Sequence, residues 1–408
     1  MQVDGALGDW QAITIKFSGE VLPRERAEAF KGAMFAAYPG DLVFSKIDAR
    51  NGAVGLIPDS IAKAVVTSEY PVFTPKADKL RAAYLNHLLR AEHFKADLQS
   101  KASGTSGRKR VTPEGFLSLE VPVPALDEQD ALVAAYTAAL SRAAQLEQEA
   151  ETIERAGWQA FETALGVAPP PPLPDRPVFV ARFKDVERWS HESILRGPSQ
   201  APYTGDGVPT APLGQLGKVS YGIQKCPANR PAVHARPYLR VANVQRGILD
   251  LDEIKYINVP DSEMPKLRLE VGDVLLCEGN SPDLVGRGAI WSGEIEDCVH
   301  QNHVLRVRVD RERLLPEFVL AVINSSHGQA YFRSKAKRTT NLASINSKEV
   351  AGLPVPVLSI AQQQDVLNAL QTQVQAAQAK RTAAATLRRS AWATFEAALF
   401  TAPEESLP

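Results

Sequence analysis

The chain has 408 residues, enough for two or three domains that each bury a hydrophobic core. Its 46 lysines and arginines balance 47 aspartates and glutamates, so any basic surface must be local. The three cysteines form no CxxC pair, which argues against a disulfide framework and a zinc cluster, and no apolar run reaches the roughly 20 residues of a membrane span. We expect a cytoplasmic protein with no membrane partner.

The first segment, residues 1–125, predicts a mixed α/β domain. ITIKFSGEVL has the pattern of two strands and a turn, and residues 40–73 carry short β-type runs separated by Gly, Asn and Pro. A helical stretch, YLNHLLRAEHFKADLQSKA, follows these runs.

Residues 126–166 predict one long helix, because the stretch from Asp127 to Leu165 has no proline and is rich in Ala, Glu and Gln. Its apolar residues recur every seven positions, which is typical of a helix that packs along another helix. The residues expected in this seam are Leu132, Tyr136, Leu146, Ile153 and Trp158.

The second half of the chain predicts the same order of elements. Residues 167–177, VAPPPPLPDRP, predict a stiff linker. Residues 178–358 predict a second α/β domain, residues 359–400 a second long helix, and residues 401–408 a tail. The seam residues expected in the second helix are Leu370, Val374, Leu387 and Trp392.

The two predicted helices differ in charge. From Asp127 to Leu165 there are eight acids and two bases, whereas from Ala361 to Phe400 there are two acids and four bases. Opposite charge favours pairing these helices with each other. The alternative is that both helices expose solvated charged faces, since single surface pairs contribute only about 0–1 kcal/mol.

The two halves repeat at an offset of 234 residues. Tyr84 aligns with Phe318, the strings LEVPVPALDEQ and LPVPVLSIAQQ align from Leu119 and Leu353, and Trp158 aligns with Trp392. A repeat this long predicts two whole structural units related by a pseudo-two-fold, not a solenoid.

Sequence motifs for catalysis are absent. The chain has no GxxxxGK phosphate loop, no GxGxxG after a strand and no HExxH. DEIK at Asp252–Lys255 has part of a nuclease pattern but no acid at a convincing spacing before it. His300 and His303 have no third ligand beside them, so we expect no metal site.

Basic residues follow the helical stretch of each half, in loops suited to phosphate contacts. Solvated surface loops are the alternative. The candidates are Lys101, Arg108, Lys109 and Arg110 in the first half, and Arg333, Lys335, Lys337 and Arg338 in the second.

A second group has the side chains that read base edges, namely Arg, Lys, Asn and Gln. Each is a weak signal alone, because turns favour Asn and Gly for backbone reasons. The candidates are Lys46, Arg50 and Asn51 in the first half, and Arg240, Asn243, Gln245, Arg246, Asn280 and Arg287 in the second.

The whole pattern resembles the DNA specificity (S) subunit of type I restriction-modification systems. The resemblance is carried by GDLVFSKIDARNGA from Gly40, SGTSGRKRV from Ser103, and the two strings LEVPVPALDEQ and LPVPVLSIAQQ. It implies an α+β protein with two pseudo-symmetric α/β target-recognition domains joined by two long antiparallel coiled-coil helices, which read the two halves of an asymmetric duplex DNA site.

The resemblance also implies a chain that is not an enzyme. Two methyltransferase subunits, which hold the S-adenosylmethionine, would be its partners together with double-stranded DNA, and restriction subunits can join them. One departure is that the first domain lacks roughly fifty residues equivalent to FKDVERWSHESI and PLGQLGKVSYGIQ, so we expect an exposed sheet edge there. A scaffold that bridges subunits without reading DNA is therefore the alternative function.

Overall fold

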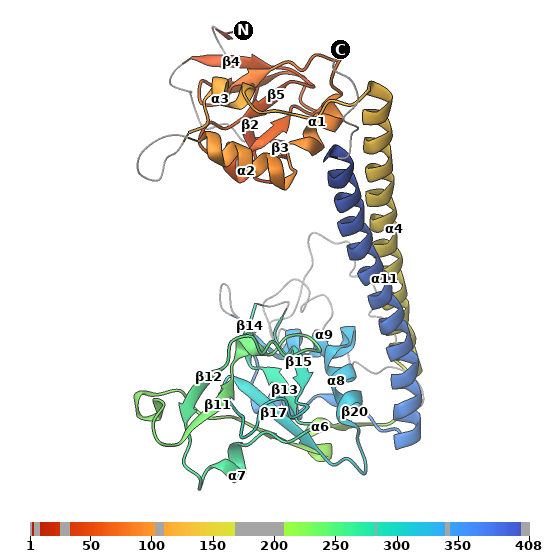
Figure 1. Cartoon of the computed structure of the whole chain (residues 1–408). Coiled ribbons are helices and arrows are strands. Elements are labelled where there is room, and N and C mark those ends of the chain that lie inside the picture. Colours follow the sequence, from red (N-terminus) through yellow and green to blue (C-terminus); the bar gives the residue numbers. More distant parts are fainter. Residues whose placement is uncertain are drawn as a thin grey trace, which may run out of the picture. The chain divides into compact units, whose positions relative to one another are not determined.

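The computed structural model divides the chain into two compact units (Figure 1). Unit 1 combines Met1–Glu149 with Ala379–Pro408, and unit 2 is Ala150–Gln378. Each unit therefore holds one expected recognition domain and a portion of both long helices. The structure describes residues 2–3, 9–24, 33–102, 110–167, 208–281, 284–338 and 343–400. The expected linker, apart from Val167, and the expected tail lie outside these residues.

Unit 1 is built on two small sheets whose inner faces are apolar. The first has the strand order β1-β4-β7-β2-β3 and the second the order β6-β5-β8. The strands are β1 (Gln2–Val3), β2 (Gln11–Ile15), β3 (Val21–Pro23), β4 (Met34–Ala37), β5 (Leu42–Phe44), β6 (Val54–Leu56), β7 (Ala64–Thr67) and β8 (Val72–Phe73).

Helices α1 (Ala82–Leu88), α2 (Glu92–Lys101) and α3 (Pro113–Leu117) belong to unit 1. Phe44 of β5, Phe73 of β8 and Phe116 of α3 stack with ring centroids 4.4 to 6.2 Å apart. These aromatic contacts add to the burial of apolar surface and fix α3 against the smaller sheet.

Unit 2 has the same smaller sheet with one more strand, in the order β10-β17-β13-β15, together with the sheets β12-β11-β16, β14-β19-β18 and β20-β9. The strands are β9 (Thr210–Pro212), β10 (Gly217–Ser220), β11 (Ala235–Leu239), β12 (Lys255–Asn258), β13 (Val274–Cys277), β14 (Gly279–Asn280), β15 (Gly288–Ile290), β16 (Val299–His300), β17 (Val304–Val309), β18 (Lys337–Arg338), β19 (Ala343–Ser344) and β20 (Pro354–Pro356).

Four short helices among the described residues of unit 2 pack around a large apolar cluster that includes Leu276, Phe318 and Phe332. They are α6 (Leu213–Leu216), α8 (Pro316–Asn324), α9 (Ser326–Lys335) and α10 (Ser347–Ala351). Helix α7 (Met264–Leu267) packs on a separate cluster that includes Ile257 and Val299.

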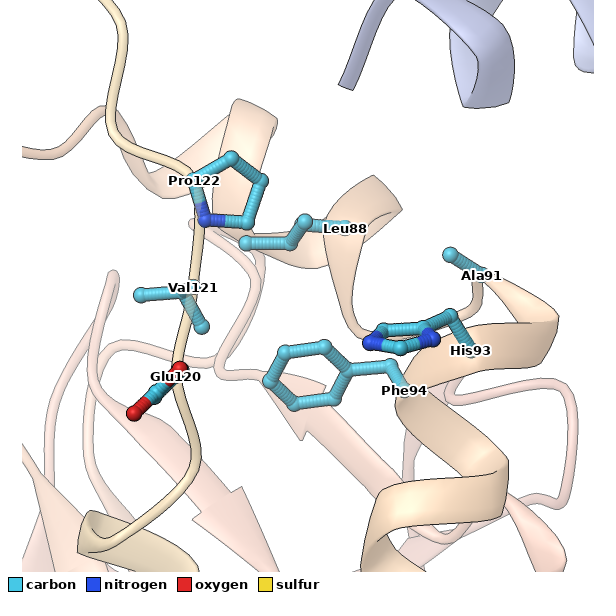
Figure 2. Close-up of a pocket in the computed structure, with 7 residues that line it drawn as sticks. All are labelled: Leu88, Ala91, His93, Phe94, Glu120, Val121 and Pro122. Carbon is cyan, nitrogen blue, oxygen red and sulfur yellow. The ribbon is translucent and has the colours of Figure 1, made fainter. Parts of the chain in front are cut away.

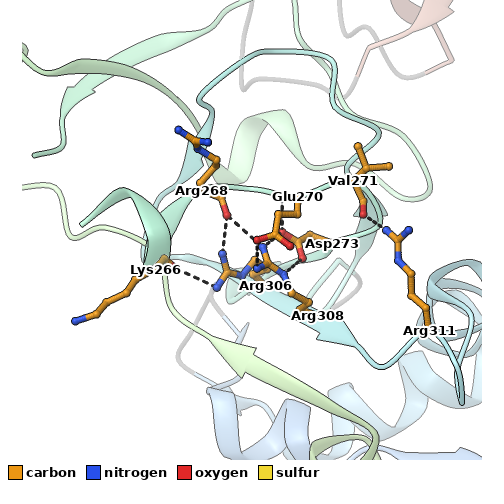
Figure 3. A network of polar contacts seen from close by, with 8 residues as sticks. All are labelled: Lys266, Arg268, Glu270, Val271, Asp273, Arg306, Arg308 and Arg311. Carbon is orange, nitrogen blue, oxygen red and sulfur yellow. Dashed lines mark hydrogen bonds and ion pairs between the residues drawn. The ribbon is translucent and has the colours of Figure 1, made fainter. Parts of the chain in front are cut away.

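A buried carboxylate orders the turn before β13 (Figure 3). Asp273 accepts two bonds of 2.7 Å from the guanidinium of Arg308 and one of 2.7 Å from the amide of Glu270. Arg306 beside it donates to the carbonyls of Arg268 and Lys266. Asp41 of unit 1 accepts in the same way from the amide of Tyr38 at 2.9 Å. Both buried carboxylates are therefore hydrogen-bonded within the fold, as buried charged groups usually are.

The two long helices form as the sequence predicts. They are α4 (Leu126–Ala164) and α11 (Ile360–Phe400), and each runs through both units. None of the helices among the described residues combines the length and apolarity needed to cross a bilayer.

The portions of α4 and α11 within each unit run antiparallel. In unit 1 the ring of Tyr136 lies 5.7 Å from that of Trp392 and 5.6 Å from that of Phe395. In unit 2, a Cβ on Gly157 would come within 2.6 Å of Gln373, so the glycine permits close approach of the helices. Four alanines at heptad spacing in the two helices, Ala143, Ala150, Ala377 and Ala384, are 0% exposed.

The remaining seam residues are partly or fully buried. Leu132, Tyr136 and Trp392 pack on the core of unit 1, and Trp158, Leu370 and Val374 belong to the core of unit 2 or pack on it. Leu146, Ile153 and Leu387 are half-buried.

The opposite helix charges pair with each other within unit 1. Glu147 bonds to Arg388 and Glu149 bonds to Lys380. The hydrogen bond from Arg388 holds the pKa of Glu147 below its usual value, and Lys380 does the same for Glu149. This pairing confirms the expectation drawn from helix charge.

One buried glutamine fixes the start of each long helix. In unit 1 the side chain of Gln129 donates to the carbonyls of Lys79 and Pro124 and accepts from the amide of Arg81. In unit 2, Gln363 makes the same three bonds, to Arg313, Leu358 and Leu315, with lengths of 2.8 to 3.0 Å. All six partners obey the offset of 234 residues, and both glutamines are 0% exposed.

A glutamate fixes the opposite end of each long helix. Glu162 near the end of α4 accepts a 2.7 Å bond from the amide of Ser326, the first residue of α9. Glu396 near the end of α11 accepts a 2.7 Å bond from the amide of Glu92, the first residue of α2. Each globule is therefore held by the start of its own helix and by the end of the other copy's helix.

The two units differ in their strands. Strands β9 and β10 and helix α6 of unit 2 have no counterpart among the described residues of unit 1. Strand β8, which occupies the position of β17, lies at the edge of its sheet among those residues.

We expect the substitution Gln363→Ala to lower the free energy of unfolding by about 2–4 kcal/mol, because it leaves two buried carbonyls and one amide without partners. Gln129→Ala should behave in the same way. The measurement is denaturant-induced unfolding of the full chain.

The matched control is Gln364→Ala, since this exposed neighbour bonds only to the side chain of Asn368. Its effect should lie within about 0.5 kcal/mol of zero. Equal losses for Gln363→Ala and Gln364→Ala would contradict the role assigned to the buried amide.

A charge swap tests the pairing of the helices. Glu147→Arg and Arg388→Glu should each lower the melting temperature, because each places like charges together, and the double substitution should recover most of the loss. The pKa of Glu147 is lowered in the folded state, so the attraction is complete above its unfolded pKa and disappears as pH falls through the folded value. Coupling that persists in strong acid, or no recovery at neutral pH, would refute an ionic contribution.

Candidate nucleic-acid interface

A tight turn in unit 2 presents two of the predicted base-reading residues. Val244 pairs with Leu249 across this turn, and the amide of Gln245 donates to Ile248 at 3.0 Å. Gly247 has a positive φ of 79°, and its amide donates to Gly288 at the start of β15. Gly19 has the same conformation in unit 1, with φ of 80°. Gly19 of ITIKFSGEVL and Gly247 of LRVANVQRGILDL therefore share this backbone conformation.

Arginines from three segments of unit 2 converge at this turn. Arg246 donates to the side-chain oxygen of Gln329 at 3.1 Å, and the nitrogen of Gln329 donates to Ile323, which fixes the amide. Burial lowers the pKa of Arg246, and the positive charges of Arg333 and Arg287 lower it further. We call Arg246, Arg287 and Arg333 the arginine cluster.

The members of the cluster differ in exposure. Arg246 is exposed and Arg333 is half-buried on α9, whereas Arg287 is only 8% exposed. The guanidinium of Arg287 donates to the carbonyl of Val244 at 2.8 Å, which holds the base of the turn. Arg287 therefore contributes charge to the cluster and supports the turn from beneath.

Two further candidates act inside the fold. Asn243 is 2% exposed; its oxygen accepts from the amide of Arg240, and its nitrogen donates to Asp250 and Glu253. Arg240 pairs with the carboxylate of Glu253 at 2.9 Å. Gln245 donates to the carbonyl of Ala242 at 2.8 Å and is half-buried. The structure therefore shows Asn243 bonded to backbone groups inside the fold and Arg240 paired with Glu253.

The basic residues after α9 lie close to the cluster in sequence. Lys335 and Lys337 are exposed. Strand β19 pairs with β18 on one side and with β14 on the other, so Asn280 and Arg338 are both in register with Ala343. The backbone thus brings the predicted residues Asn280, Lys337 and Arg338 into one small sheet.

The candidates of unit 1 are more dispersed. Asn51 is exposed but donates to Asp48 at 3.3 Å within the 3-10 turn Ala49–Asn51, while Lys46 and Arg50 are half-buried. Arg110 forms an ion pair of 3.3 Å with Glu69.

Lys101 is exposed at the last position of α2. Arg108 and Lys109 lie outside the described residues. The structure therefore brings fewer of the predicted cations together in unit 1 than in unit 2.

The arginine cluster is particular to unit 2. Ser18 occupies the position of Arg246 in the matching turn of unit 1, and Gln99 occupies the position of Arg333 at the repeat offset. Arg90 holds the turn in unit 1 by donating to the carbonyl of Ser18 at 2.7 Å. The two turns share a glycine of positive φ but present different side chains.

Residues that resembled a catalytic or metal site have structural partners. Burial lowers the pKa of His300 to about 4, and its ring lies 2.7 Å from the carbonyl of Val304. His303 pairs with Glu278 at 2.6 Å, and Glu253 of the DEIK string pairs with Arg240 and Lys255. Within the described ranges, no group of three or more His, Cys, Asp or Glu residues could hold a metal ion.

Comparisons with known proteins point in one direction. No protein-family model matches the sequence. The putative specificity subunit of the type I restriction enzyme MjaX from Methanocaldococcus jannaschii is 25% identical over 135 residues, which cover 33% of this chain and 32% of that protein. The EcoKI specificity subunit of Escherichia coli is 19% identical over 289 residues, or 70% of this chain and 57% of that protein.

A solved structure reported for the complex assembly and conformational transition of the type I restriction-modification system covers 96% of this chain and 90% of that chain, with a TM-score of 0.61 and 15% identity. The chain is a relative of type I specificity subunits. It shares their fold and spans less than two thirds of the length of the two curated relatives above.

The sequence patterns did not predict several residues that support the candidate interface or attach the long helices. Gln329 positions Arg246, while Gln129, Gln363, Glu162 and Glu396 attach the helices. The paired glutamines and glutamates could have been found from the repeat, since each pair is identical at the offset. Gln329 has no such signal, because Lys95 occupies its position in unit 1.

Proposed function

We propose that the chain is a specificity subunit that binds a bipartite, asymmetric duplex DNA site and directs an adenine methyltransferase to it. The arginine cluster is the observation that carries the proposal. Three like charges held together raise the electrostatic energy of the free protein, and an anionic ligand relieves it. Phosphate oxygens and guanine acceptors are the DNA groups that match arginine in this way.

In unit 2 the side chains divide into two roles. Arg246 lies at the tip of a turn fixed by Gly247 and Gln329, so it is the leading candidate for a base edge, with Gln245 beside it. Arg333, Lys335 and Lys337, with Arg338, are candidates for phosphate contacts that position the domain without reading sequence.

In unit 1 the same division gives a different set. Arg50, Lys46 and Asn51 are candidates for base contacts around the 3-10 turn, and Lys101 and Arg110, with Arg108 and Lys109, for phosphates. Because the side chains differ while the frame repeats, the two units would read different half-sites, which makes the whole site asymmetric.

The partners follow from this role. Two methyltransferase subunits would bind the outer faces of α4 and α11, and they would bring the S-adenosylmethionine and the catalytic groups. Restriction subunits would join the same complex where cleavage occurs. This chain itself would supply no catalytic residue.

A second candidate function is a scaffold that bridges methyltransferase subunits without full DNA reading. It is favoured by unit 1, whose described residues lack counterparts of β9, α6, β10 and the arginine cluster. A retained preference for one duplex as salt rises distinguishes specific reading from this alternative, since screening removes phosphate contacts first.

Substituting Arg246 tests base reading in unit 2. Arg246→Ala should weaken binding to the preferred duplex by about 1–3 kcal/mol and relax the preference at one base pair. Lys337→Ala should instead weaken binding to all duplexes alike, and it should reduce the slope of log affinity against log salt concentration by about 1. Both are measured by fluorescence anisotropy over a salt series with a randomised duplex pool.

Lys218→Ala is the matched control. Lys218 is an exposed cation in β10, which is the edge strand at one side of the sheet, whereas the turn lies beside β15 at the other side. It should leave both affinity and slope unchanged. If Arg246→Ala lowered the affinity for every duplex equally, Arg246 would be a phosphate contact and its assignment to a base edge would fail.

The helices set the spacing between half-sites in this proposal. Removing seven facing residues from α4 and from α11 shortens each helix by about 10.5 Å, or roughly three base pairs of duplex. We expect methylome sequencing of cells carrying this deletion to show both half-sites unchanged and the gap between them shorter. Altered half-sites with the original gap would overturn the assignment.

A further inference from the structure

Unit 1 has an uncovered strand-like segment beside a cavity. Residues Glu120–Pro122 run past a cavity of about 250 Å³, which is lined by Leu88, Ala91, His93 and Phe94 on the opposite side (Figure 2). Leu117 at the end of α3 nearby is 66% exposed. The carbonyl of Pro122 accepts from the hydroxyl of Tyr84 at 3.1 Å. A cavity beside an extended segment whose amides are open resembles the sites at which an extended peptide adds a strand.

The matching surface of unit 2 is covered. Strand β20, at the repeat offset from Glu120–Pro122, pairs antiparallel with β9. The amide of Val357 donates to Pro209, and the amide of Leu213 donates to Leu353, both at 2.8 Å. The short helix α6 then places Gly214 against Ala351, which has the position of Leu117.

Coverage changes the burial of matching residues. Leu353 and Val355 are fully buried in unit 2, whereas Leu119 and Val121 of unit 1 are only half-buried. Leu213 and Leu216 belong to the same apolar cluster as Val355.

In unit 1, neither Val121 nor Val123 donates its amide to a described backbone carbonyl. A segment with the chemistry of β9 and α6 would satisfy these donors and cover apolar side chains, both of which favour its binding.

Helix α11 delivers the C-terminal tail to this surface. Phe395 and Leu399 of its last turns are buried in the same cluster as Leu88 and Phe94, which line the cavity, and Val121 packs on that cluster. Residues 401–408, TAPEESLP, follow directly and lie outside the described residues. Seven extended residues reach roughly 25 Å, which is ample within one apolar cluster.

The tail also repeats the sequence that covers unit 2. Thr401-Ala402-Pro403 matches Thr210–Pro212 of β9, and Leu407 follows at the same spacing as Leu216 of α6. Proline suits an edge strand, because it has no N–H to donate to a neighbouring strand. Threonine is common in strands. Leucine at the fourth position after Pro is what fills the core beside β20 in unit 2.

We propose that residues 401–407 bind along Glu120–Val123 of unit 1 and place Leu407 over the cavity. The tail then does for unit 1 what β9 and α6 do for unit 2. This contact ties the end of α11 to the domain whose described residues include no counterpart of β9 and α6, and it is independent of whether the chain reads DNA.

Hydrogen–deuterium exchange of the full chain and of a chain ending at Phe400 tests the proposal. Removing the tail should speed exchange at the amides of Val121 and Val123 by about tenfold or more, because local opening no longer breaks a ladder bond. The amides of Val355 and Val357 should be unchanged, which provides an internal control on folding. Leu407→Asp should act like the deletion, whereas Ser406→Ala should not.

A synthetic peptide with the β9–α6 sequence, VPTAPLGQLGK, provides a second readout. It should bind the shortened chain and slow exchange at Val121, and bind the full chain much more weakly because the tail competes. Equal exchange with and without the tail would overturn the proposal. Equal peptide binding to both chains would also overturn it, since the surface would then be open to another segment or to a second copy.

Discussion

The structure depends on one buried amide at the start of each long helix. Gln129 and Gln363 each bond to three backbone groups of the globule that precedes the helix, so the helix leaves that globule in one fixed direction. A buried polar group of this kind is costly unless every bond is made, which restricts the arrangement to one geometry. The far ends are fixed by Glu162 and Glu396 on the first amides of α9 and α2. Each unit is thus closed by parts of both copies, and α4 and α11 depend on each other for their placement.

This frame is made largely from backbone groups, which explains why the surface chemistry of the two units can differ. The turn around Gly19 and the turn around Gly247 have the same φ, yet one presents Ser18 and the other Arg246. Arg90 supports the first turn through a carbonyl, and Arg287 supports the second in the same way. A change of the residue at the tip alters what the turn can bind without altering the bonds that hold it. One repeated fold can therefore present two different sets of side chains.

Much of the fold follows from the sequence because it depends on periodic patterns. The 234-residue repeat, the proline-free helices and their opposite charges predict α4, α11 and the pairs of Glu147 with Arg388 and Glu149 with Lys380. The binding residues are harder to predict, because the sequence does not distinguish a polar turn residue that bonds to the backbone from one that contacts a ligand. Asn243 turns inward to bond Arg240, Asp250 and Glu253, and Arg110 meets Glu69, which is distant in sequence. Such choices are made by tertiary contacts that no local pattern records.

The distribution of charge separates the two tasks of the chain. The net charge is close to zero, and the positive charges of Lys380 and Arg388 on α11 are satisfied by Glu149 and Glu147 of α4. Helix pairing therefore uses much of the basic charge in the frame. A second group of cations, Arg246, Arg287 and Arg333, lies at the turn and on α9 of unit 2, where Arg246 contacts the neutral amide of Gln329. The positive charges of Arg333 and Arg287 lower the pKa of Arg246, so this part of the surface concentrates positive charge that the helix pair has largely balanced in its own residues.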